Sequence, residues 1–512
     1  MLEKLSPLKP GKTIRRLAAV KRLSTRVDPP GRALDNKQGS TMKRLLHAVF
    51  PTLAAFALLG SPANAQGTLS AAQTETIAKD AYIYGYSLVT SELTRLAATN
   101  TTKPNPETLQ APMNDIANVP EYPPATYKGV TAPNADTLYT FGFFDLSKEP
   151  MVFSYPNMGK RFFLFPMYDE WTDVVGVPGT RTMGGAAQKI LLSGPNWHGS
   201  VPPGMKQIKM PTNIMFMIGR VYCDGSAADL TAVHALQAQF KLAPLSKLGQ
   251  TYTPPTGTAG SKYSPKDIVR DVIASWSTSE YFNFMAKAMV DNPPVLPRDA
   301  SMVAEMAKIG LAPGQPFDMG KLSPTAQKAL ASLPKAIVSQ LAELKKTGGT
   351  VANGWLIPAA AGSYGTNYAA RAAVSAFGWG ANLPQDAIYP YAPGGTSAAL
   401  NGAHTYKVHF AKGLTPPAKG FWSITMYDDR FYFYPNALNK LTVCMRNLPK
   451  FNADGSLDLY FSHTQPSGVA QSNWLPAPAG TFILMMRIYW PNPSPPSILN
   501  KSWVPPPVVR MK

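Results

Sequence analysis

A carboxylate and a phenol lie close together in the segment Asn134-Ala135-Asp136-Thr137-Leu138-Tyr139. At the rim of a pocket, Asp136 and Tyr139 would suit proton transfer or the binding of a polyol. Asn and Asp also favour turns, because their side chains bond nearby backbone N–H groups. The segment is therefore either part of a catalytic site or a turn that starts a strand, and the turn is the simpler interpretation.

Paired carboxylates follow two similar runs of residues. Asp169 and Glu170 come after one apolar run, and Asp428 and Asp429 come after the other. Two carboxyl groups that face each other at roughly 5 to 10 Å can hydrolyse a glycoside. Asp428 is therefore a third catalytic candidate beside Asp136 and Tyr139. Solvated strand ends are the default explanation of all four acids.

Three arginines lie in unusually apolar or small-residue surroundings. Arg220 and Arg487 are each inside an apolar run, where an unpaired charge would cost several kcal/mol. We expect each to form a structural ion pair with an acidic strand end of its own half, Asp169 or Asp428. A site for an anion or carboxylate is the alternative. Arg371, on a helix of small residues, is expected to face a ligand.

Aromatic residues are frequent, with 9 Trp and 22 Tyr in the chain. Amphipathic rings line clefts for sugars and apolar ligands, although core packing explains most of them. The residues expected to bind a ligand are Arg371, Tyr389, Trp422, Tyr427, Asn473 and Trp474.

Signatures of metal and cofactor chemistry are weak. The histidines after residue 65 form no His-x-x-x-His pair, and no phosphate-binding Gly loop is present. The sequence predicts no cofactor and no metal site, although ligands from distant segments would escape this test.

A repeated pattern organises the chain. Met167-Tyr168-Asp169-Glu170 is matched by Met426-Tyr427-Asp428-Asp429. Each copy is followed by an Asn-Trp pair and then by a run that ends in Arg-x-Tyr, at Arg220 to Tyr222 and at Arg487 to Tyr489. Three matches in one order indicate two related β domains and direct attention to the place where they meet.

The periodicity of apolar residues predicts the elements around these motifs. Helical spacing covers 71–96, with more helices expected at 227–240, 265–276, 279–290, 301–308, 325–346 and 364–377. Strands are expected at 137–145, 151–155, 161–167, 189–192 and 213–222, and again at 404–410, 421–427, 440–445, 457–461 and 481–489. The predicted fold is mixed and mainly β: two jelly-roll-like antiparallel β-sandwiches, an internal duplication, with a helical region between them. The boundaries are 66–225 for the first sandwich with its leading helix, 226–388 for the helical region, 389–490 for the second sandwich and 491–512 for a Pro-rich tail.

The N-terminal segment has the features of a secretory signal. Lys43 and Arg44 precede an apolar stretch, and Ala63-Asn64-Ala65 is a small-x-small cleavage site, so residues 42–65 are the predicted signal peptide. Residues 1–41 are a basic extension or a mis-assigned start. We expect a periplasmic or secreted protein without an integral membrane segment, because the apolar stretch is short and interrupted by Pro51.

Net charge and cysteine content limit which partners and which covalent links we expect. The full chain carries +19, of which about ten charges remain after residue 65, and they are scattered, which argues against nucleic-acid binding. Cys223 and Cys444, one in each half, would form a disulfide between domains in an oxidising compartment or stay as two buried thiols, which is the simpler interpretation.

The chain also resembles two known families. Pro133 to Tyr139, Asp145-Leu146-Ser147 and Tyr168-Asp169-x-Trp171-Thr172 are similar to the N-terminal module called domain of unknown function 1254. Gly420 to Asp428, Ser472 to Pro476 and Arg487-x-Tyr489-Trp490-Pro491 resemble its usual companion, domain of unknown function 1214. The resemblance implies two jelly-roll-like sandwiches with helices between them, and it implies no activity and no catalytic residue.

Two classes of function follow. The first is an exported protein that binds a small polar or aromatic ligand in an inter-domain cleft rimmed by Asp136, Tyr139, Arg371, Tyr389, Trp422 and Asn473, with cofactor-independent hydrolysis as a further expectation. The second is a non-catalytic envelope scaffold, in which the helical region forms the surface of a homo-oligomer. An enzyme would show a titratable group with a perturbed pKa among convergent polar side chains, whereas a scaffold would show exposed apolar patches.

Overall fold

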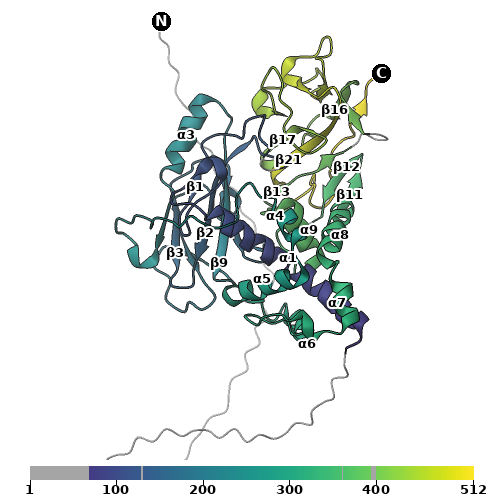
Figure 1. Ribbon diagram of the computed structural model, residues 1–512. Helices are drawn as coiled ribbons and strands as arrows, with labels where there is room; N and C mark the ends of the chain where they lie inside the picture. Colours follow the sequence, from purple (N-terminus) through teal and green to yellow (C-terminus); the bar gives the residue numbers. More distant parts are fainter. Residues whose placement is uncertain (1–68, 129–130, 360, 394–398) are drawn as a thin grey trace, which may run out of the picture. The chain divides into compact units, whose positions relative to one another are not determined.

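The structure, a computed structural model, describes residues 69–128, 131–359, 361–393 and 399–512 (Figure 1). The predicted extension 1–41 and signal peptide 42–65 lie outside these residues. Within them the fold is mixed α/β, with antiparallel pairing in each of its sheets.

Helix α1, Ala71–Ala98, begins the described chain. Ser70 caps it, since its hydroxyl accepts from the backbone N–H of Gln73 while the Gln73 side chain accepts from the Ser70 backbone. The tyrosines of this helix, Tyr82, Tyr84 and Tyr86, are all buried, so α1 is a core helix.

The other helices are mostly found between the two groups of strands. They are α2 Thr180–Met183, α3 Ala227–Gln237, α4 Val269–Ser275, α5 Thr278–Asp291, α6 Ala300–Lys308, α7 Pro324–Leu330, α8 Leu333–Thr347 and α9 Tyr368–Gly378. Short 3-10 helices are η1 Pro106–Thr108, η2 Leu245–Lys247, η3 Met319–Lys321, η4 Met445–Asn447 and η5 Gln471–Asn473. One apolar core unites α1 with residues of α4 to α9.

The N-terminal half contains two sheets. The larger has the order β1 Ala117–Asn118, β2 Thr137–Asp145, β9 Ile214–Tyr222, β5 Met167–Asp169 and β6 Val174–Gly176, with β4 Phe163–Leu164 also on β9. The smaller has the order β10 Lys241–Pro244, β3 Met151–Tyr155, β7 Gln188–Ser193 and β8 Lys206–Lys209.

The C-terminal half also contains two sheets. The larger has the order β11 Gly349–Ala352, β12 Trp355–Pro358, β14 Tyr391–Ala392, β21 Thr481–Pro491, β17 Ala418–Asp428 and β18 Thr442–Cys444, with β13 Ala387–Ile388 and β15 Leu400–Asn401 on β21. The smaller has the order β20 Trp474–Pro476, β19 Leu457–Ser462, β16 Tyr406–Phe410 and β22 Val509–Arg510.

The pairing in one half is repeated in the other. A long strand, β9 or β21, pairs antiparallel with β5 or β17 on one side. In the smaller sheets, β3 and β16 pair antiparallel with β7 and β19, which pair parallel with β8 and β20. None of the described sheets closes into a barrel.

Two local expectations need correction, and the tail adds one short edge strand. The helix predicted over 325–346 is two helices, α7 and α8, because Pro334 suits the first turn of a helix and cannot continue one. The expected helical region also supplies strands: β10 joins the smaller N-terminal sheet, and β11 and β12 join the larger C-terminal sheet. The Pro-rich tail ends in β22, which pairs with β16.

Cys223 and Cys444 are both buried and free, so the inter-domain disulfide does not form in this structure. The alternative of two buried thiols is the correct one. Across the described residues, the helices are all too short or too polar to cross a membrane.

Candidate functional site

Polar side chains on or next to strands of the two larger sheets meet in a group that we call the seam cluster. Its members are Asn134, Asp136, Tyr139, Arg220, Tyr389, Ser423, Tyr427, Arg446, Arg487 and Tyr489. Three short hydrogen bonds join the halves directly: Asn134 Nδ2 to Tyr489 OH at 2.8 Å, Ser423 Oγ to Asp136 Oδ2 at 2.6 Å, and Tyr427 OH to the Pro133 carbonyl at 2.6 Å.

The segment from Asn134 starts strand β2 through a turn. The Asn134 Oδ1 accepts from the backbone N–H groups of Asp136 at 2.7 Å and Thr137 at 3.1 Å. The turn interpretation of this segment is therefore correct. The same turn also points Asp136, which is 0 % exposed, into the seam.

Asp136 is held by partners from the C-terminal half. Its Oδ1 lies 2.7 Å from Nη2 of Arg446. That nitrogen donates to the carbonyl of Ala135 at 2.8 Å and to Thr442 Oγ1 at 2.7 Å, so its N–H groups do not point at the carboxylate. Since Oδ2 already accepts from Ser423, Asp136 is better placed to bind a donor than to act as a free base.

Arg220 and Arg487 are buried without a carboxylate partner. Arg220, 7 % exposed, donates to the carbonyl of Ile218 at 2.9 Å and to Asn382 Oδ1 at 3.0 Å. Arg487, 5 % exposed, donates to Tyr427 OH at 2.7 Å and to the carbonyl of Ala132 at 2.8 Å. In the part of the chain that the structure describes, neither forms an ion pair.

The predicted ion pairs with Asp169 and Asp428 are therefore wrong, because those carboxylates point elsewhere. Asp169 closes a turn beside the helices, and its Oδ1 accepts from the Asp173 N–H at 2.8 Å. Asp428 is at the surface, where it accepts from the Tyr432 N–H at 2.8 Å and lies 3.7 Å from Lys128.

Tyrosine rings replace acids around these two cations. The Arg220 guanidinium lies 5.2 Å from the Tyr139 ring centre, and that of Arg487 lies 5.2 Å from the Tyr389 ring centre. Burial raises the pKa of Tyr389, Tyr427 and Tyr489, against the opposing effect of the nearby arginines. These phenols therefore stay neutral and cannot offset the arginine charges. Tyr139 and Tyr389 are only partly buried.

The seam carries an excess of positive charge. The three arginines Arg220, Arg446 and Arg487 face one carboxylate, that of Asp136. The nearby Asp386 adds no net charge, because it binds Arg181 through two hydrogen bonds of 2.6 and 2.9 Å.

Some buried polar atoms in and beside the seam cluster have no hydrogen bond. Among the described residues these are Asp136 Oδ1, Arg220 Nε, Arg446 Nη1 and Arg487 Nε in the cluster, and Thr137 Oγ1 and Thr425 Oγ1 beside it. Buried polar atoms normally have a hydrogen-bond partner, so these atoms are able to bind a further polar group.

A second polar group, the junction cluster, lies between the N-terminal sheet and the helices and comprises Asp169, Glu170, Asp173, Arg298, Asp299 and Arg371. Arg371 is 0 % exposed, with Nη1 3.8 Å from Asp173 Oδ2 and Nη2 donating to the Tyr84 carbonyl at 3.1 Å. Its guanidinium lies 5.0 to 5.3 Å from the ring centres of Tyr84, Trp171 and Tyr368. The structure therefore places Arg371 in the helical layer and not in the seam.

We expected Asp169 and Glu170 to be solvated strand ends, but both are buried. Burial, and secondarily Asp173, raises the pKa of Asp169 to about 7, although Arg371 and Arg298 oppose this. Burial also raises the pKa of Glu170. Thr172, in the turn between Asp169 and Asp173, has φ of 73°, which is strained for a β-branched residue.

Three other expected ligand residues lie outside both clusters. Trp422 is in the C-terminal core, with its ring 5.7 Å from that of Phe410. The Asn473 side chain accepts from the Lys450 N–H and donates to its carbonyl, each at 2.7 Å. Trp474 donates through Nε1 to the Ser462 carbonyl at 3.1 Å. These contacts are the kind that hold loops and packing in place.

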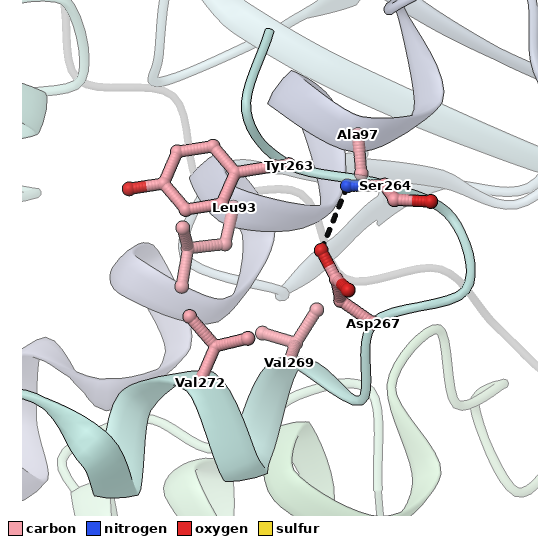
Figure 2. Close-up of a pocket in the computed structure, with 7 residues that line it drawn as sticks. All are labelled: Leu93, Ala97, Tyr263, Ser264, Asp267, Val269 and Val272. Atoms are coloured by element: carbon pink, nitrogen blue, oxygen red, sulfur yellow. Dashed lines mark hydrogen bonds between the residues drawn. The ribbon is translucent and has the colours of Figure 1, made fainter.

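A small hollow beside α1 does not provide an alternative site (Figure 2). It is lined mostly by apolar side chains, including Leu93, Val269 and Val272, and its one drawn hydrogen bond runs from the Ser264 N–H to Asp267 Oδ2 at 2.8 Å. Its volume of about 10 Å³ has room for one water at most. We treat it as a packing defect.

Sequence reasoning missed Arg446 and Ser423, the direct partners of Asp136. Arg446 lies in the short 3-10 helix η4, in a stretch of sequence with no distinctive pattern, so only the fold identifies it. In the portion described by the structure, no three His, Cys, Asp or Glu side chains gather in the way a metal ion requires.

Comparison with known proteins identifies both halves. Residues 113–244 match the family model described as protein of unknown function (DUF1254), and residues 386–493 match that of DUF1214. The chain combines a DUF1254 domain with a DUF1214 domain. The seam cluster lies where these domains meet, because β2 and β9 belong to the DUF1254 match and β17 and β21 to the DUF1214 match.

Solved structures support the fold only. The crystal structure of the VPA0106 protein from Vibrio parahaemolyticus aligns with a TM-score of 0.63 at 22% identity, over 86% of this chain and 100% of that one. A putative uncharacterized protein from Burkholderia cenocepacia aligns with a TM-score of 0.41 at 11% identity, over 86% and 95%. No curated protein matches the chain.

Proposed function

We propose that this DUF1254–DUF1214 protein binds a small anionic ligand at the seam cluster. The observation that carries the proposal is the pair Arg220 and Arg487, both buried, both cationic and neither paired with a carboxylate within the described residues. Burying a charge without a counter-charge costs several kcal/mol, and an anion from solution removes that cost. Planar guanidinium groups suit carboxylate and phosphate geometry.

Each of the two arginines is packed against an aromatic ring. The Arg220 guanidinium lies over the ring of Tyr139, and the Arg487 guanidinium lies over the ring of Tyr389. Both tyrosines are partly buried residues. We propose that an anion reaches the guanidinium groups when these side chains rotate.

Binding is better supported than hydrolysis. Asp136 already has Ser423 and Arg446 as neighbours, and the acids Asp169 and Asp428 have no contact residue in common. Asp169 and Asp428 therefore do not form the facing pair of carboxylates that glycoside hydrolysis would require. The alternative is an envelope scaffold with a homo-oligomer formed through the helical region. The exposed Val290 and Leu296 of that region favour it.

The expected setting of this function is the periplasm or the outside of the cell. The motif in residues 42–65 supports export, and two thiols buried away from oxidants are compatible with it. We also infer that the two halves arose by duplication. The repeated Met-Tyr-Asp motif and the repeated strand pairing support this inference.

The test is the thermal stability of the full chain with added benzoate, acetate or phosphate. A ligand that binds only the folded state raises the melting temperature. We expect at least one of these anions to do so, and we expect Arg487→Lys to weaken its binding by about tenfold or more, because Lys keeps the charge but loses the planar fork. Arg430→Lys, at an exposed arginine of the same half, is the matched control. An anion effect that is equal in both variants would overturn the proposal.

A further inference from the structure

The unpartnered atoms of the seam describe a ligand with two kinds of polar group. Three of them are N–H donors that carry positive charge: Arg220 Nε, Arg446 Nη1 and Arg487 Nε. One of them, Asp136 Oδ1, is an acceptor that carries negative charge. An anion that only accepts hydrogen bonds would satisfy the arginines and leave the aspartate oxygen without a donor.

Two of the residues, Arg220 and Arg487, are connected through neighbouring side chains. Arg220 reaches Tyr389 through Asn382, which accepts from Arg220 at 3.0 Å and donates to Tyr389 OH at 2.7 Å. Tyr389 in turn lies under Arg487. At the other end, Arg446 and Asp136 are 2.7 Å apart but do not exchange a well-directed hydrogen bond.

A hydroxyl group fits the misaligned pair of Asp136 and Arg446. It would donate its proton to Asp136 Oδ1 and accept from Arg446 Nη1, which satisfies both atoms at once. A carboxylate fits the pair of Arg220 and Arg487 for the reason given above. Resting on the proposed anion site, we infer that the ligand is a small hydroxylated carboxylic acid, with its carboxylate at Arg220 and Arg487 and a hydroxyl at Asp136 and Arg446.

Three six-carbon probes separate this inference from the anion site on which it rests. D-Gluconate has a carboxylate and hydroxyls, hexanoate has only the carboxylate, and sorbitol has only hydroxyls. Calorimetric titration of the full chain should show gluconate binding roughly tenfold to a hundredfold more tightly than hexanoate, the range expected for a hydrogen bond to a charged group. Sorbitol should bind least.

The outcomes test the anion site and the hydroxyl assignment separately. Equal binding of gluconate and hexanoate would retain the anion site and overturn the hydroxyl assignment. Sorbitol binding as tightly as gluconate would overturn both claims, and so would the absence of binding by all three probes.

A variant checks the position of the hydroxyl. Asp136→Asn removes the charge that accepts the hydroxyl proton, so we expect it to reduce the preference for gluconate over hexanoate and to leave hexanoate binding intact. Thr442→Val, which removes a neighbour of Arg446 but no ligand contact, is the comparison. The wild-type preference is decisive even if Asp136→Asn fails to fold.

Discussion

Buried and half-buried arginines differ within this protein by the partners that they have. Arg181 binds Asp386 through two nitrogens, and Arg298 binds Asp299 at 2.8 Å. Arg220 and Arg487 instead have carbonyls, an amide and phenols. The first arrangement stabilises the arginine charge within the fold, whereas the second provides only neutral partners, and for this reason we propose an anion site there.

Asp169 should make the stability of the protein depend on pH. Its pKa is raised from 3.8 to about 7 in the folded state, chiefly by burial. The folded state therefore holds its proton more tightly, so this stabilisation is complete below about pH 4 and is lost as the pH rises to about 7. One such group changes the free energy of unfolding by at most about 1.4 kcal/mol per pH unit.

Asp169→Asn cannot ionise, so we expect urea unfolding of this variant to show a flatter decline of stability between pH 4 and 7 than the wild type. Part of the pH dependence should remain in this variant, because the pKa of Glu170 is also raised. An unchanged slope in Asp169→Asn would show that Asp169 is already ionised in the folded protein.

Among the elements, β2 and β17 present the seam. The register of β17 against β21 places Ser423 opposite Arg487, so both side chains are brought to the seam by one pair of strands. Strand β2 carries Tyr139 opposite Arg220 on β9. Close packing behind β2 keeps this strand in position.

Gly142 of β2 should not tolerate a side chain. A Cβ there would lie 2.5 Å from the carbonyl oxygen of Asp115 and 2.8 Å from the ring of Phe144. We expect Gly142→Ala to reduce the free energy of unfolding by about 1–3 kcal/mol, measured by chemical denaturation. Gly378→Ala in α9, where a Cβ meets nothing within 4 Å, should be neutral or slightly stabilising. Equal stability of the two variants would contradict this account.

In the whole molecule, the two domains are tied by polar contacts as well as by apolar packing. Asn134, Asp136 and Pro133 of the N-terminal half bond directly to residues of the C-terminal half. Apolar side chains of both halves also share a core that includes Phe162 and Tyr489. Loss of one half would expose the polar groups of the other, so the halves should unfold together.

Calorimetry of the full chain should therefore show one main transition for the two domains. Tyr427→Phe removes the hydroxyl that bonds both Pro133 and Arg487, and we expect it to cost about 1–3 kcal/mol. Tyr434→Phe, at a partly buried tyrosine of the same half, is the control. Two separate transitions in the wild type would refute the coupling of the domains.

The sequence alone determined most of the local structure. Predicted strands at 137–145 and 151–155 coincide with β2 and β3, and the helix predicted at 71–96 is α1. Alternation, helical spacing and capping are properties of neighbouring residues, so they can be recognised without the fold. The two family resemblances were also confirmed, because they depend on contiguous motifs.

The tertiary structure alone decided which of the candidate residues meet. It brings Asp136, Tyr139, Tyr389 and Tyr427 together with Arg220 and Arg487, and it places Arg371 and Asp169 at the helical layer. The partners of a buried acid or arginine come from segments that are distant in the sequence. Ser423, for example, donates to Asp136 from 287 residues away. Such contacts follow from how sheets and helices pack, and no short pattern in the chain records them.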